Sequence, residues 1–310
     1  MAKRSDGKRL GRRAALAGAG ALGLAGLLEF ESLRGAWDHR RPLLASAKDT
    51  FRASVAKSTA KNAGIVHVGH STHLLCLGSH RLLTDPWFYD PAFGALAHQH
   101  GPAVAPNELG PLSALLISHD HPDHADARAM DAMDKRAKVL VATQELATRV
   151  KRLGFQDVHT LQPWEEIMVG SVRVTAVPAL HDCYEIGFVC AGAGTSVYFA
   201  GDTRLHPDME RIREQLAPHF GILPVDGTRL MSDVPSTMTP EDAVRAAQLL
   251  GLVDAMPSHA EAMLTDPLAK HVLAHVIPGA AQAFARQMQG QKARCWVPGP
   301  GDWVPLAQKG

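Results

Sequence analysis

The most constraining feature of this chain is the heptapeptide Ser118-His119-Asp120-His121-Pro122-Asp123-His124, which follows a short apolar run at 114–117. The apolar run is uninterrupted and comes after a Gly-Pro pair, which favours a buried strand over a helix. Three imidazoles and two carboxylates therefore follow directly on the end of a strand. Although the chain has 17 histidines, a solvated loop that is rich in histidine by chance explains this spacing poorly, and a metal site explains it well.

The order of these residues predicts how they divide between two directions. Residues two apart in an extended chain point the same way, so His119 and His121 present two imidazoles to one side. The proline that follows turns the chain and can begin a helix, which we expect over 124–136. Asp123 and His124 then leave in another direction and could serve a second ion.

Three more polar side chains follow predicted strands elsewhere in the chain. His181 comes after an alternating apolar segment, Asp202 follows a strand and a glycine turn, and His259 follows a third apolar run. The three strands are expected over 171–177, 195–200 and 253–256. Imidazole and carboxylate donors favour zinc, and manganese or iron also suit them.

With these residues in place, the chain from about residue 64 to 305 resembles the metallo-β-lactamase-fold hydrolase superfamily. The resemblance implies a four-layer αββα sandwich with a two-metal site at one rim of its two sheets. It assigns one metal to three imidazoles, the other metal to a carboxylate and two imidazoles, and a bridging position to Asp202. The implied metal ligands are His119, His121 and His181 for one ion, and Asp123, His124 and His259 for the other.

Four further motifs resemble a narrower branch, which contains N-acylphosphatidylethanolamine phospholipase D and L-ascorbate-6-phosphate lactonase. These motifs are Val68-Gly69-His70-Ser71-Thr72, Leu83-Thr84-Asp85-Pro86, Ala200-Gly201-Asp202-Thr203 and Thr239-Pro240-Glu241-Asp242-Ala243. The segments Asn107-Glu108-Leu109 and Trp164-Glu165-Glu166 favour the phospholipase side. Membership in a branch of this kind indicates the chemistry better than the substrate.

Other branches of the superfamily fit less well. The short interval between Asp202 and His259 leaves no room for the inserted domain of β-CASP nucleases, which disfavours RNA processing. His121 stands where the oxygen-reducing di-iron flavoproteins have a glutamate. Cys183 is two residues beyond His181, and we expect it to be a small packed residue away from the metals.

The function that we predict is hydrolysis by a binuclear metal centre through a metal-bridging hydroxide. The first choice is a phosphodiesterase resembling phospholipase D, acting on a lipid-like or small phosphodiester, with Asp123 and Asp202 as the catalytic residues. The first alternative is a lactonase or another carboxylic-ester or amide hydrolase that uses the same site. The second is a metal-binding protein without catalytic activity.

Several residues near these motifs receive supporting roles. Asp85 ends another strand-like run and could orient a ligand histidine through its free ring N–H, although Asp-Pro is also a common turn signal. We expect a structural role for His70, and Asp120 should point away from the metals. In the loop 87–110, we expect the His98 and His100 pair to be solvated, and the aromatic side chains to close the sandwich edge or line the substrate entrance.

The amino terminus has the pattern of an export signal. Six basic residues within 3–13 precede an uncharged, apolar and glycine-rich run at 14–28, and Gly11-Arg12-Arg13-Ala14 loosely resembles a twin-arginine motif. We therefore expect an exported protein that is periplasmic or attached to the membrane through this segment. The run is shorter than the ~20 residues that span a bilayer.

The remaining chain suits one large α/β domain. We expect the signal or anchor over 1–30, a linker over 31–62 and the hydrolase domain over 63–310, with helices over 144–153, 207–216, 240–250 and 268–288. The net charge of +1 is smaller than the contribution of the basic amino terminus, so the domain itself is mildly acidic and no nucleic-acid partner is expected. Four scattered cysteines do not indicate a disulfide framework.

Overall fold

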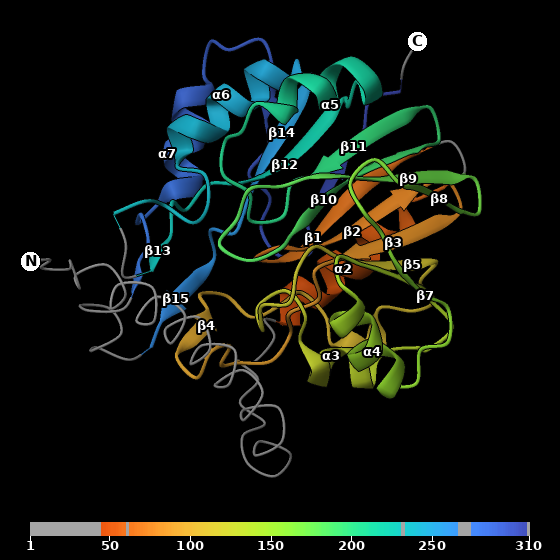
Figure 1. The fold of residues 1–310 in the computed structure, drawn as a ribbon. Coiled ribbons are helices and arrows are strands. Elements are labelled where there is room, and N and C mark those ends of the chain that lie inside the picture. Colours follow the sequence, from red (N-terminus) through yellow and green to blue (C-terminus); the bar gives the residue numbers. More distant parts are fainter. Residues whose placement is uncertain (1–44, 60–61, 231–232, 266–273, 309–310) are drawn as a thin grey trace, which may run out of the picture. The chain divides into compact units, whose positions relative to one another are not determined.

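A computed structural model describes residues 45–59, 62–230, 233–265 and 274–308. Two seven-stranded sheets dominate these residues, one formed mainly by the first half of the domain and the other by the second half. Helices cover the outer face of each sheet, so the order of layers is αββα (Figure 1). The four-layer sandwich expected from the sequence is confirmed.

The first sheet has the strand order β18-β1-β2-β3-β5-β6-β7. Its first strands form antiparallel hairpins, whereas β3, β5, β6 and β7 run parallel. Strand β5 is buried along its whole length, as its unbroken apolar sequence predicts. The strands are β1 (Gly64–Gly69), β2 (Thr72–Leu77), β3 (His80–Thr84), β5 (Ala114–Ile117), β6 (Lys138–Val141), β7 (Val158–Thr160) and β18 (Trp303–Pro305).

The second sheet has the order β17-β14-β12-β11-β10-β9-β8. Strands β8 to β11 are antiparallel, and β11, β12, β14 and β17 are parallel. Its strands are β8 (Glu166–Val169), β9 (Val172–Pro178), β10 (Ile186–Gly192), β11 (Thr195–Phe199), β12 (Phe220–Pro224), β14 (Asp254–Ser258) and β17 (Arg294–Cys295). Two short pairs lie outside the sheets: β4 (Leu96–His98) with β15 (Ala262–Leu264), and β13 (Arg229–Leu230) with β16 (Ala274–His275).

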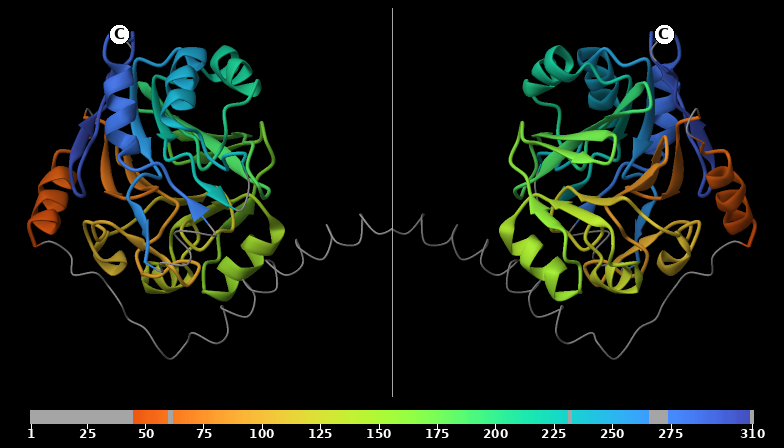
Figure 2. Two further views of the ribbon diagram at one scale, coloured as in Figure 1. Left: turned by 90° about the vertical axis from the view of Figure 1, so that its left-hand side faces the viewer. Right: turned by 90° about the vertical axis from the view of Figure 1, so that its right-hand side faces the viewer.

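The helices divide between the two outer layers. Amphipathic helices α5, α6 and α7 cover the second sheet, and α2, α3 and α4 pack on the first (Figures 1 and 2). The space between the sheets is filled by fully buried side chains such as Phe188, Phe199 and Phe220. The helices are α2 (Ala45–Ala56), α3 (Ala127–Ala132), α4 (Gln144–Arg152), α5 (Asp208–Leu216), α6 (Pro240–Leu250) and α7 (Ala280–Met288), with a 3-10 turn η1 (Pro106–Glu108).

Helix boundaries follow local capping. The Thr239 side chain accepts from the Asp242 backbone N–H and the Asp242 carboxylate accepts in return, which forms a capping box at the start of α6. The helix expected over 124–136 is wrong at both ends, because α3 covers only Ala127–Ala132 and begins after Asp126. The Asp126 carboxylate accepts from the backbone N–H groups of Arg128 and Ala129 and is a stronger cap than the proline at 122.

Helix α2 falls inside the segment that was expected to be a linker. Ala47 and Phe51 are buried in the core that joins α2 to the first sheet, and α2 contacts β1 and β18. The linker predicted over 31–62 therefore does not extend over α2.

The expected export signal at 1–30 lies outside the described residues and stays a prediction, as does the location of the protein. Among the residues that the structure describes, no helix has both the length and the apolar character required to cross a bilayer.

Replacing Phe51 tests whether α2 belongs to the domain. Phe51→Ala removes a ring that is 3% exposed, so the free energy of unfolding should fall by about 3 kcal/mol in chemical denaturation. Its neighbour Arg52, whose side chain is 63% exposed, provides the control, since Arg52→Ala should change stability by no more than about 0.5 kcal/mol. Equal stability of both variants would mean that α2 is not part of the cooperative unit.

Candidate metal centre

The ends of strands from both sheets meet at one edge of the sandwich. Parallel strands place their carboxyl ends at the same edge of a sheet, and the polar residues that follow β5, β11 and β14 therefore approach one another. Strands β3, β9 and β12 also deliver polar residues to this edge. The residues concerned are Asp85, His119, His121, His181, Asp202, Asp226 and His259.

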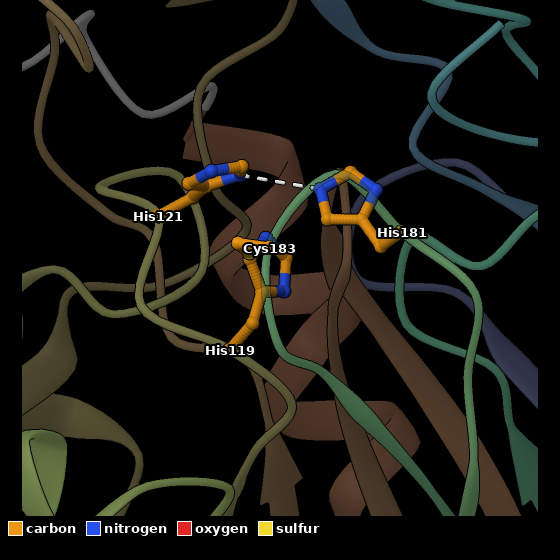
Figure 3. Close-up of side chains that lie close together, drawn as sticks. All are labelled: His119, His121, His181 and Cys183. Atoms are coloured by element: carbon orange, nitrogen blue, oxygen red, sulfur yellow. Dashed lines mark hydrogen bonds between the residues drawn. The ribbon is translucent and has the colours of Figure 1, made fainter. Parts of the chain in front are cut away.

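Three imidazoles form the first cluster, as the sequence predicts. His181 Nε2 lies 3.5 Å from His121 Nδ1, and the ring of His119 has its centroid 4.4 Å from that of His121 and 4.9 Å from that of His181. Figure 3 shows the three rings converging, with Cys183 among them. The donor atoms of all four residues lie within 4.8 Å of one another, so the expectation that Cys183 packs away from the site is wrong.

Asp123, His124 and His259 form the second cluster together with His70. Asp123 Oδ2 lies 3.7 Å from His124 Nε2 and 3.6 Å from His259 Nε2. Asp202 stands between the two clusters: its Oδ2 is 3.1 Å from both His124 Nε2 and His259 Nε2 and 3.9 Å from His119 Nε2. The structure thus brings together all seven residues named as ligands from the sequence.

The carboxylate of Asp85 holds residues of both clusters in place. Its Oδ2 lies 2.7 Å from His124 Nδ1 and accepts a hydrogen bond of 2.6 Å from Ser118 Oγ, which in turn lies 2.9 Å from His119 Nδ1. A carboxylate in this position fixes the ring orientation and leaves the opposite nitrogen free to bind a metal. The geometry agrees with the orienting role that was considered for Asp85.

Glu185 supports the site in a way that no sequence signal revealed. Its side chain is fully buried, with Oε1 at 3.2 Å from His119 Nδ1 and accepting a 2.7 Å hydrogen bond from the backbone N–H of Asp202. Gly201 makes this approach possible, because a Cβ at that position would lie 2.1 Å from Glu185 Oε1. Glu185 therefore links a first-cluster histidine to the carboxylate between the clusters.

His259 and His181 each have an oxygen atom of another residue close to Nδ1. Asp226 Oδ2 lies 3.0 Å from His259 Nδ1, and His181 Nδ1 lies 3.0 Å from the backbone carbonyl oxygen of Ser236, to which it can donate. Asp226 follows β12 and was missed from the sequence, since one carboxylate after a strand carries no ligand spacing. In each case the nitrogen that faces the cluster is the one left for a metal.

The donor atoms that face the clusters fit a divalent metal ion. Among the described residues, none offers a well-aligned hydrogen-bond partner to Nε2 of His119, His124 or His259, or to Oδ1 of Asp123 or Asp202. All five side chains are buried, and a buried polar atom without a partner costs free energy that a cation would offset. Imidazole and carboxylate are the donors that zinc and similar ions take in proteins.

The histidines of the two clusters differ in their pKa values and therefore in their protonation. Burial and the neighbouring imidazoles lower the pKa of His119 and of His121 to about 3, so both rings are neutral and ready to bind metal. Burial also disfavours charge on His124 and His259, but Asp202 and its neighbouring carboxylates outweigh it and raise the pKa of both rings well above the ordinary value. These two imidazolium ions in turn hold the pKa of Asp202 well below its usual range despite burial.

The structure also tests the expectations for three other residues near the ligand motifs. The Asp120 carboxylate pairs with Arg149 and faces away from the clusters, as expected. The expectation that His98 is solvated is wrong: it is buried, stacks on Trp87 with 3.7 Å between ring centroids, and has Nδ1 2.8 Å from Asp90 Oδ1. His100 is exposed.

Comparisons with known proteins give one family and a consistent group of relatives. The family model described as a Beta-lactamase superfamily domain matches residues 80–260. A UPF0173 metal-dependent hydrolase of Natranaerobius thermophilus is 30% identical over 77% of this chain and 97% of its own length, and one of Pyrobaculum calidifontis is 33% identical over 62% and 81%. A possible metal-dependent hydrolase from Veillonella parvula has a similar fold, with a TM-score of 0.65 at 17% identity, covering 78% of this chain and 99% of that one.

The protonation of the second cluster predicts proton release when metal binds. At pH 7 the raised pKa values of His124 and His259 leave both rings protonated, and a metal must displace those protons. Zinc titrated into metal-free protein should therefore release protons, and affinity for the second cluster should rise with pH. Calorimetry in two buffers of different protonation enthalpy measures this, and a binding heat that is the same in both would contradict it.

Proposed function

Because the chain belongs to the Beta-lactamase superfamily domain family and is a metal-dependent hydrolase, we propose that its two clusters hold two divalent ions that together cleave a phosphodiester. The observation that carries this proposal is the position of Asp202, whose Oδ2 faces His119 on one side and His124 and His259 on the other. A carboxylate placed in this way suits a bridge between two ions. The donor set favours zinc, and manganese or iron would also suit it.

Two ions bound side by side would supply hydroxide at neutral pH and neutralise charge on the substrate oxygens. The residues of the chain then have three tasks. Asp202 sets the separation of the two clusters. Asp123, whose Oδ1 has no aligned hydrogen-bond partner among the described residues, can accept a proton as well as bind. Asp85 and Glu185 hold the rings of His124 and His119 in the orientation that metal binding requires.

The surroundings of the first cluster support a substrate with an apolar part. Phe93 is 49% exposed and its ring lies edge-on to His121 at 5.4 Å between centroids. Leu180 and Tyr184, which flank His181 and Cys183 in sequence, are 46% and 48% exposed. Exposed apolar side chains beside metal-ligand residues, in space for Phe93 and in sequence for Leu180 and Tyr184, are typical of a binding surface. A lipid-like phosphodiester of the kind that phospholipase D enzymes cleave would use such a surface.

A substrate panel tests the reaction. Protein loaded with zinc or manganese should hydrolyse bis-p-nitrophenyl phosphate and phospholipids faster than lactones or a cephalosporin. His121→Ala removes a donor of the first cluster and should reduce kcat/KM by more than about 100-fold, whereas His100→Ala, an exposed histidine outside the clusters, should not. If a lactone or another carboxylic ester is turned over faster than any phosphodiester, the proposed phosphodiesterase activity is contradicted and the ester-hydrolase alternative is supported.

The apolar surface predicts chain-length dependence. Phe93→Ala removes contact with an acyl chain and should raise KM for a long-chain phospholipid by about tenfold, equivalent to ~1.4 kcal/mol of binding. KM for a short-chain analogue should change little. Met168→Ala is the matched control, because Met168 is similarly exposed, at 53%, but lies on β8 away from the ligand segments. Parallel effects of the two substitutions would argue against apolar recognition by Phe93.

A further inference from the structure

His70 is held at the metal clusters by an unusual backbone. It occupies the turn between β1 and β2 with φ +53°, in the left-handed region that residues other than glycine adopt at a cost. Its backbone N–H donates a 3.0 Å hydrogen bond to Glu261 Oε2, two residues after His259. Strain of this kind persists only where surrounding contacts fix it, and here they fix the direction of the imidazole.

The imidazole of His70 is buried without a hydrogen-bond partner. The residue is 1% exposed, and neither Nδ1 nor Nε2 has a partner among the described residues. An unpaired buried donor or acceptor costs about 1–3 kcal/mol. Trp87 packs edge-on against the ring at 5.0 Å and His259 lies at 4.2 Å, and a phenyl ring would make these contacts without that cost. Packing alone therefore does not account for a histidine.

The Nε2 atom of His70 lies where a donor to the second ion would be. It is 3.9 Å from Asp123 Oδ2, compared with 3.7 Å for His124 Nε2 and 3.6 Å for His259 Nε2. A nitrogen and an oxygen donor bound to one zinc ion at about 2.1 Å each can be no more than ~4.2 Å apart. All four side chains offer donor atoms within 4.8 Å of one another, so a small movement of the rings places them around one ion.

We propose that His70 is an additional ligand of the second ion, beside Asp123, His124 and His259, an inference that rests on the two-ion centre proposed above. His70 lies outside residues 80–260, the segment that the family model matches. An extra imidazole raises the number of protein donors at the second ion to four.

Replacement by glycine separates ligation from packing. His70→Gly tolerates the positive φ and leaves space for free imidazole. We expect metal analysis to show the first ion retained and the affinity for the second lowered by about 10-fold to 100-fold. Added imidazole should restore the second ion. Unchanged affinity for both ions, or a loss that imidazole does not repair, would overturn the proposal.

Two matched variants complete the test. His259→Gly, at a ligand with the same φ of +53°, should lose the second ion in the same way. His98→Asn changes another buried histidine with an unpartnered Nε2 on the far side of Trp87 and should keep both ions. If the glycine variant does not fold, the metal affinities of His70→Asn are measured in its place, because asparagine also tolerates a positive φ.

Diffraction at the zinc edge from wild-type crystals grown with zinc provides a measurement that needs no variant. A second ion about 2.1 Å from His70 Nε2 supports the proposal, and a separation of more than 3 Å overturns it. These results do not depend on turnover. If the protein binds the second ion through His70 but cleaves no phosphodiester, only the proposed reaction is refuted. A single bound ion would refute the two-ion centre itself.

Discussion

The structure depends on burying many polar and charged side chains where strands of two sheets end together. His119, His124, Asp123, Asp202 and His259 are almost completely buried. Two imidazolium ions face two carboxylates across 3.1–3.7 Å, while donor atoms on every one of these residues lack a well-aligned partner in the described part of the chain. Bound cations would give these donor atoms partners, so metal binding is expected to stabilise the folded protein.

The two sheets provide the rigidity that such a site requires. Buried strands with apolar side chains on both faces fix the positions from which the ligands start. Backbone irregularities then aim individual side chains: His70, Asp85 and His259 all have positive φ values, and Gly201 leaves space for Glu185. Buried carboxylates behind the histidines, namely Asp85, Asp226 and Glu185, set ring orientations.

Sequence patterns predicted local elements and the order of the ligands well. The strands before His119, His181, Asp202 and His259 lie within one or two residues of their expected ranges, because unbroken or alternating apolar runs are local signals. Two of the errors concern features that depend on distant residues. Helix α2 looked like a charged linker until Phe51 was seen to pack on the first sheet, and Cys183 was misjudged because His119 and His121 come from a remote segment. His98 was misjudged for another reason, since no local pattern shows that its own loop folds back to bring Trp87 and Asp90 against it.

The sequence by itself determined the strands that carry the ligands and the chemical type of the site, because the His-x-His-x-Asp-His spacing and the later histidines and aspartate have few other uses. The fold class followed from the family resemblance that these motifs carry. Only the tertiary structure decided which residues surround those ligands. Glu185 and Asp226 are single acids without a motif, and His70 resembled a structural residue in a turn. Their roles come from distances between segments far apart in the sequence, such as the contacts of His70 with Asp123, 53 residues away, and with Glu261, 191 residues away. Such distances are set by the packing of the two sheets.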